Sequence, residues 1–159
     1  MSTATRPDYA RLSPALFKKY LDFSMAFRMD ETLALLVDIR ASQLNGCAFC
    51  LDMHVKQARL RGERELRLHH VAIWRESALF TDVERAALAW TEALTRLDPA
   101  VGVPDALYDE ARRHFDEEAL AQLTFRVAAI NGWNRLNVAF RTAPGSKDAA
   151  FGLSESGLA

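Results

Sequence analysis

Apolar residues recur along most of the chain every three or four positions, the spacing that aligns them on one face of a helix. No alternating run of β-branched residues bounded by turns competes with this pattern. We therefore predict an all-α single helical domain of about six to eight helices, spanning residues 1–159. Helices are expected over residues 14–27, 31–45, 46–62, 86–97, 104–114 and 117–141, with one or two short helices over 63–76.

Capping residues set the boundaries of these helices. Ser13 before Pro14 is typical of a helix start, because proline is favoured at the first helical position. Thr81 and Glu84 have the spacing of a capping box, in which each side chain binds the other residue's backbone N–H. Further caps or stops are expected at Asp30, Asn45, Gly46 and Asp116.

The last expected helix is apolar on nearly every side. Such a helix must be surrounded by protein, and in a domain of this size another subunit can supply part of the cover. Gly132 in mid-helix indicates the close approach of another backbone. Its polar residues need hydrogen-bond partners when buried, and we expect a network that fixes packing or an interface. These residues are Asn131, Asn134, Arg135 and Asn137.

The charge balance is almost neutral, with 20 basic and 21 acidic side chains and no sustained run of either sign. It therefore gives no electrostatic support for a nucleic-acid or anionic-membrane partner. The start of the chain lacks a signal-like apolar segment, and no stretch approaches the roughly 20 apolar residues that cross a bilayer. We expect a soluble, cytoplasmic protein with terminal arms at 1–11 and 143–159, ordered only where something packs on them.

Both cysteines of the chain lie in Cys47-Ala48-Phe49-Cys50, and His54 follows one helical turn later. At about 100° per residue, Cys47, Cys50 and His54 fall within a sector of about 60°. Cys47 is expected in the first turn of its helix, where the positive dipole end favours a thiolate. His54 is the i+4 neighbour of Cys50 and can act as its base.

This cluster predicts redox chemistry, because a disulfide that closes so short a loop adds little stability. It supplies a nucleophile, a base and a resolving thiol, the groups needed to reduce a peroxide through a sulfenic acid and a disulfide. For that chemistry we expect the two sulfurs near an opening that solvent or a small oxidant can enter.

Three other interpretations compete. A structural zinc site needs four ligands, and no second ligand pair has regular spacing. Buried, unreactive cysteines are the second alternative. A thioredoxin-like site is the third, but it needs a strand before the motif, whereas this motif follows a helix. The remaining histidines receive no functional role: His69, His70 and His114.

Four segments of the chain together resemble the alkylhydroperoxidase D-like group of the carboxymuconolactone decarboxylase superfamily. They are residues 40–54 (RASQLNGCAFCLDMH), 74–80 (WRESALF), 84–90 (ERAALAW) and 132–137 (GWNRLN). The resemblance implies an all-α homo-oligomer, often a trimer or hexamer, with its site near subunit contacts. It also implies thiol-dependent peroxidase or disulfide-reductase activity in antioxidant defence, with no haem, flavin or metal. Carried over from the family, Cys50 attacks the hydroperoxide, Cys47 resolves, and His54 belongs to the proton relay.

One position departs from the family pattern. Peroxidase-active members place a glutamate twelve residues before the first cysteine, and here that residue is Leu35, which cannot relay a proton. Glu31 and Asp38 lie on the same helix face and either can stand in, although solvated surface carboxylates are the simpler interpretation of both.

Our leading hypothesis is a peroxidase that reduces hydroperoxides, with a dithiol such as dihydrolipoamide or a thioredoxin-like protein as reductant. A carboxymuconolactone decarboxylase-type enzyme is an alternative that needs no paired thiols. A non-catalytic oligomer that senses oxidation through the disulfide is another.

Overall fold

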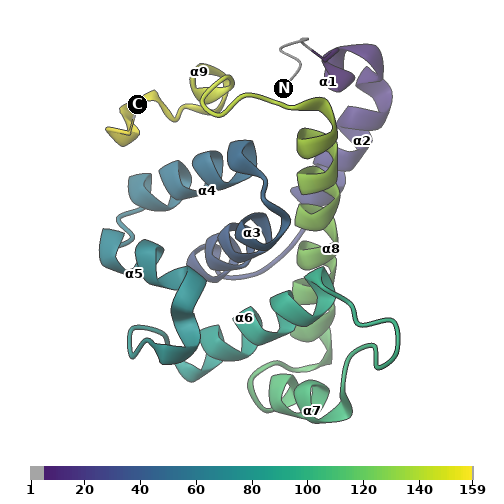
Figure 1. Ribbon diagram of the computed structural model, residues 1–159, viewed down its shortest axis with the longest axis vertical. Helices are drawn as coiled ribbons and strands as arrows, with labels where there is room; N and C mark the ends of the chain where they lie inside the picture. The colour runs from purple at the N-terminus through teal and green to yellow at the C-terminus, as the bar shows by residue number, and fades with distance from the viewer. Residues whose placement is uncertain (1–5, 159) are drawn as a thin grey trace.

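One central helix organises the molecule. In the computed structural model, which describes residues 6–158, α3 (Glu31–Asn45) lies in the middle of the fold. It packs against α4 (Ala48–Leu60), α6 (Asp82–Thr95) and α8 (Glu117–Phe140), which surround it in Figure 1. The predicted all-α class is confirmed, since residues 6–158 contain no strand.

Shorter helices complete the described chain. Two of them are single turns: α9 lies inside the expected C-terminal arm and α1 overlaps the end of the N-terminal one. Residues 6–158 therefore hold nine α-helices, against about six to eight expected. The remaining elements are α1 (Tyr9–Leu12), α2 (Pro14–Ser24), α5 (Glu65–His70), the 3-10 segment η1 (Val71–Glu76), α7 (Asp105–His114), α9 (Asp148–Phe151) and the 3-10 segment η2 (Ser154–Ser156).

Apolar residues from both sides of α3 form the core. Leu33 and Val37 pack in a cluster with α6, α7 and α8, and Leu36 and Ile39 pack in a second cluster with α4, α5, η1 and α6. Burial on both sides explains why α3 lacks a polar face. This double burial holds the start of α4, where the cysteines lie, against a rigid neighbour.

Most predicted helix boundaries are confirmed within a few residues. The capping box of Thr81 and Glu84 is present, and Asp30 and Asp116 each accept a first-turn N–H. Ser13 precedes Pro14 as expected but its side chain makes no capping hydrogen bond, and α2 ends at Ser24 instead of near residue 27.

The C-terminal segment is ordered because it packs on α4. The buried Lys56 ammonium binds Asp52 of the same helix at 3.0 Å and Asp148 of α9 at 2.7 Å. The Gly145 N–H also donates to Asp52, at 3.0 Å, and Leu153 is buried. Figure 1 shows this yellow segment running from the end of α8 across α4. The condition set for the arm, that something packs on it, is therefore met.

The α8 helix is covered on only part of its surface within this chain. Phe125 and Val138 are about half exposed in the single chain, so the prediction that another subunit supplies part of the cover stays a prediction. Gly132 does mark a close approach, but the neighbour is a side chain, not a backbone. A Cβ at Gly132 would overlap the Tyr20 hydroxyl, which itself donates to the Ala129 carbonyl at 2.7 Å.

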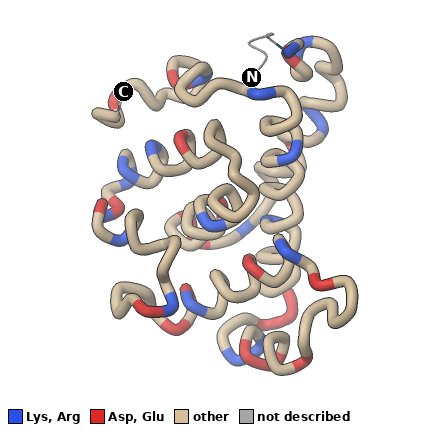
Figure 2. Tube along the Cα trace, in the orientation of Figure 1, with Lys and Arg blue, Asp and Glu red and all other residues tan. Residues whose placement is uncertain are grey.

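Basic and acidic residues are interspersed over the fold, as Figure 2 shows. Among residues 6–158 no helix combines the length and apolar character that spanning a membrane requires.

Candidate redox site

A left-handed glycine places the cysteines at the start of α4. Gly46, with φ of +65°, ends α3 and turns the chain back, and the Cys47 N–H then donates to the Ser42 carbonyl at 3.0 Å. Cys47 is the N-cap of α4, one position before the first turn in which it was expected. Its sulfur accepts from the Cys50 N–H at 3.2 Å. The predicted proximity to the positive helix end is retained, because an N-cap side chain faces the same N–H groups.

The two cysteines form a disulfide, so the cluster joins them as the spacing predicted. Cys47 is 2% exposed and Cys50 is 1% exposed. The expectation that the sulfurs lie near an opening is therefore wrong for this oxidised form of the chain. Phe49 and Met53 pack with the cysteines in one apolar cluster, and α8 contacts the same end of α4. Small molecules reach the sulfurs only if this cover moves.

Asn137 of α8 contacts the disulfide directly. Its Nδ2 lies 3.6 Å from the Cys50 sulfur and 3.0 Å from the Trp133 carbonyl oxygen. That carbonyl can only accept, so the amide nitrogen must be at this end, with one of its two hydrogens available to the sulfur. The Tyr9 hydroxyl donates to the other end, Oδ1, at 3.2 Å. Burial raises the pKa of Tyr9 to about 12, so its hydroxyl stays protonated and keeps donating.

His54 is buried on α4 with its Nδ1 facing acceptors. The Gln57 Oε1 lies 2.9 Å away, and the Asp38 Oδ2 of α3 lies 3.5 Å away. A carboxylate oxygen accepts, so Nδ1 carries the hydrogen and Nε2 is left with a lone pair. The neutral ring is therefore protonated on Nδ1, the tautomer in which the Asp38 carboxylate orients the ring and Nε2 can act as a base.

The protonation of His54 is decided by burial. Loss of hydration is the largest effect and lowers the pKa of His54; Asp38 and Gln57 oppose it, and Arg126 adds to it. The short distance from Nδ1 to Asp38 permits an ion pair, but Arg126 already binds both oxygens of that carboxylate, its Nε at 2.9 Å. We therefore assign the neutral imidazole.

Of the two stand-in carboxylates, the structure brings only one to the site. Asp38 is 1% exposed and lies between His54 and Arg126, so its interpretation as a solvated surface group is wrong. Glu31 is exposed and pairs with Arg61 at the far end of α4, as expected for a surface carboxylate.

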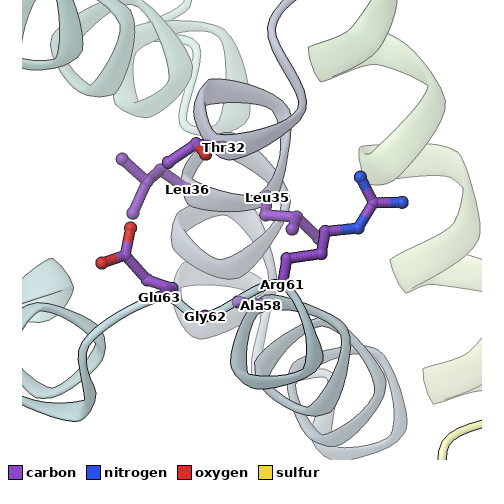
Figure 3. A pocket seen from close by; sticks show the side chains of 7 residues that line it. All are labelled: Thr32, Leu35, Leu36, Ala58, Arg61, Gly62 and Glu63. Atoms are coloured by element: carbon purple, nitrogen blue, oxygen red, sulfur yellow. The ribbon is translucent and has the colours of Figure 1, made fainter.

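Leu35, at the family's glutamate position, is a core residue in this chain. It packs with Leu36 and Ala58 and lines a small pocket of about 130 Å³ between α3 and the end of α4. Figure 3 shows Leu35 facing the turn that carries Arg61 and Gly62. Asp38, three residues later on α3, is the carboxylate that faces His54, the contact that a proton relay through His54 would use.

The asparagines predicted to form a network do so next to the cysteine turn. Asn45 donates to both Asn131 and Asn134, at 2.9 and 2.8 Å, and Asn134 donates to Ser42 at 3.0 Å. Arg135 donates to Asn131 from the exposed side. These bonds fix the end of α3 to α8, and so fix the turn from which Cys47 emerges.

The other candidate residues lie outside this site. His70 contacts Ser77 and His114 contacts Glu110. Within residues 6–158, no group of three or more His, Cys, Asp or Glu side chains is arranged to hold a metal ion.

Sequence reasoning missed Tyr9 and Arg126 as neighbours of the site. Tyr9 lies in the segment predicted to be an arm. Nothing in the sequence around Arg126 indicates which residue its side chain binds. The i+11 spacing from Arg126 to Asn137, three helical turns, was the one available hint that both share a face of α8.

Comparison with known proteins gives matches over most of the chain. A model of the carboxymuconolactone decarboxylase family matches residues 14–93. The uncharacterized protein YdfG of Bacillus subtilis (strain 168) is 38% identical over 145 residues, which are 89% of this chain and 98% of that protein. The uncharacterized protein YnjA of Escherichia coli (strain K12) is 36% identical over 72% of this chain and 60% of that protein.

Solved structures share the fold. A protein of unknown function from Agrobacterium tumefaciens, whose name proposes an antioxidant defence protein AhpD, has a TM-score of 0.83. It is 38% identical, and the match covers 89% of this chain and 98% of that one. The apo structure of the debrominase Bmp8 has a TM-score of 0.75 at 21% identity, over 92% of this chain and 79% of that one. This second likeness concerns the fold alone.

Proposed function

The chain belongs to the carboxymuconolactone decarboxylase family, with an alkylhydroperoxidase D-like fold, and we propose that it is a thiol-dependent peroxidase that reduces hydroperoxides. The observation that carries the proposal is the Cys47–Cys50 disulfide at the start of α4, with a neutral histidine one turn later on the same helix that a buried carboxylate orients. An antioxidant role for the Agrobacterium relative, as its name proposes, points the same way.

The reaction starts from the reduced dithiol. The Cys50 thiolate attacks the outer oxygen of R–O–O–H, the O–O bond breaks, and the alkoxide leaves and takes a proton to become R–OH. Cys50 is then a sulfenic acid. The Cys47 thiolate attacks the Cys50 sulfur, hydroxide leaves and is protonated to water, and the disulfide forms. A dithiol such as dihydrolipoamide, or a thioredoxin-like protein, then reduces the disulfide and is itself oxidised.

The neighbouring groups divide the work of proton transfer and charge stabilisation. His54, with Nδ1 held by Asp38 and Gln57, offers Nε2 as the base for the cysteine thiols. Asn137 donates an N–H toward Cys50, and the α4 N-terminus donates the Cys50 N–H to Cys47. Both contacts favour a thiolate over a thiol.

A peroxide consumption assay tests the proposal. Wild-type protein with dihydrolipoamide or dithiothreitol should consume hydroperoxide catalytically, and Cys50→Ser should abolish turnover. Cys47→Ser should permit one oxidation of Cys50 to the sulfenic acid, trapped with a sulfenate reagent, without formation of the intramolecular disulfide. Absence of turnover in the wild type, or unchanged turnover in Cys50→Ser, would contradict the proposal.

The burial of both sulfurs favours a second candidate, an oligomer that senses oxidation without turnover. A closed disulfide that exchanges slowly suits a stoichiometric switch better than a rapid enzyme. In this case one equivalent of peroxide would oxidise the protein, excess dithiol would not sustain consumption, and gel filtration would show a change of oligomer size between the reduced and oxidised forms.

A further inference from the structure

An apolar groove lies between the N-terminal helices and α8. Its volume is about 770 Å³, within the range of small-molecule sites. Its walls include Leu16 of α2, Tyr20 and the indole of Trp133. Leu16 is 69% exposed, although leucine side chains contribute stability when buried. The groove therefore offers apolar surface that this chain leaves open to water.

The groove borders the disulfide. Tyr9 is one of its lining residues, and the Tyr9 hydroxyl donates to Asn137, whose amide nitrogen is 3.6 Å from the Cys50 sulfur. Two polar contacts therefore separate the groove from the reacting atom. A molecule bound there would approach Asn137, and Cys50 behind it, by displacing the Tyr9 hydroxyl from Asn137.

The charged residues at the groove are all basic. Lys19 and Arg135 line it, and its lining includes no aspartate or glutamate. An apolar ligand that carries one negative charge would match both features. A second copy of the chain in a two-fold contact through this face would match them less well, because it would bring two Lys19 and two Arg135 side chains together without lining carboxylates.

We propose that this groove binds the organic part of the substrate, an apolar chain that carries an acidic group, with the hydroperoxide directed toward Cys50. This inference rests on the proposed peroxidase function and names the substrate class for the same site: hydroperoxides of apolar carboxylic acids.

Binding to the oxidised protein tests the groove without any turnover. Dodecanoate is the probe, and dodecyltrimethylammonium, with the same chain and the opposite charge, is the comparison; calorimetry measures both. One dodecanoate should bind per chain, more tightly than the cation. Lys19→Ala should weaken dodecanoate binding about three- to fivefold, the effect expected of one exposed charge. Lys18→Ala is the matched control, because Lys18 pairs with Asp22 and does not line the groove.

A steric variant provides a second arm. Leu16→Trp should fill the groove and reduce dodecanoate binding, whereas Leu66→Trp, at an exposed leucine on α5, should leave it unchanged. In steady-state assays of the reduced protein, Lys19→Ala should lower the ratio of kcat/KM for a fatty-acid hydroperoxide over that for hydrogen peroxide by the same factor as it weakens binding.

The outcomes separate the two proposals. Dodecanoate binding that Lys19→Ala and Leu16→Trp weaken, without consumption of any peroxide, supports the groove and contradicts the peroxidase. Peroxide turnover without dodecanoate binding, or equal binding of anion and cation, overturns the groove. Absence of binding together with a dimer in sedimentation that Leu16→Trp dissociates also overturns it, because a second copy is then the occupant.

Discussion

Asn137 joins Tyr9 to Cys50: its amide oxygen accepts from the Tyr9 hydroxyl, and its amide nitrogen donates toward the Cys50 sulfur. We predict that Asn137→Leu, which keeps the number and branching of the side-chain heavy atoms but removes the N–H donor, shifts the pH midpoint of Cys50 alkylation upward by about one unit, since a hydrogen bond to a charged group contributes roughly 1.5 kcal/mol. Iodoacetamide labelling of the reduced protein followed by mass spectrometry measures this midpoint.

Tyr9→Phe is the matched control for Asn137. It keeps the ring in place and removes only the hydroxyl that orients the amide, so the midpoint should move in the same direction by a smaller amount. An Asn137→Leu midpoint equal to that of the wild type would show that the contact to Cys50 is only packing.

His54 should make stability dependent on pH. Its pKa lies below the ordinary value near 6.5, so the unfolded chain binds more protons as the pH falls through that value, and the free energy of unfolding falls with it. We predict that the free energy of unfolding of the wild type, measured with urea, falls as the pH is lowered from 7.5 to 5.5. His54→Gln should remove this part of the pH dependence. A wild type and a variant with parallel pH profiles would contradict the assignment of a neutral, buried imidazole.

Sequence reasoning at this scale identified the cysteines and His54, because a helical repeat places them on one face. It left Asp38 and Glu31 as equal candidates for the relay and favoured a surface position for both, because a carboxylate in an apolar run gives no sign of its partner when that partner, Arg126, is 88 residues away. It also predicted open sulfurs, since their burial beside α8 arises from tertiary packing that local spacing does not contain.

At the scale of the helices, the capping residues give a direct comparison. Thr81→Ala should lower the free energy of unfolding by about 1 kcal/mol, because the Thr81 hydroxyl accepts from the Glu84 N–H. Ser13→Ala should change it much less, because Ser13 makes no capping bond although it precedes a helix-starting proline. Chemical denaturation measures both, and equal losses would show that N-cap identity alone, without the bond, sets the stability.

Helix positions were predictable to within a few residues because caps and glycine stops act locally. The α1 and α9 turns were not, since each is a four-residue helix too short to show periodicity. Their order comes from contacts with distant segments, as when Lys56 binds Asp148.

For the whole molecule, the disulfide should be a minor source of stability. A loop of about four residues is expected to contribute roughly 2 kcal/mol at most, less than half of what a loop of 100 residues would. We predict that reduction lowers the free energy of unfolding by no more than this and leaves the helical circular dichroism unchanged. A loss well above it, or a loss of helix, would assign the disulfide a structural role and weaken the case for redox chemistry.

The distance along α8 from Arg126 to Asn137 fixes the geometry of the site. Arg126 holds the carboxylate that orients His54, and Asn137 contacts Cys50, so one continuous helix sets the position of both halves of the site. Inserting or deleting a single residue between them would rotate one relative to the other by about 100°. Changes of length within the three turns that separate Arg126 from Asn137 should therefore abolish the site even where the helix itself still forms.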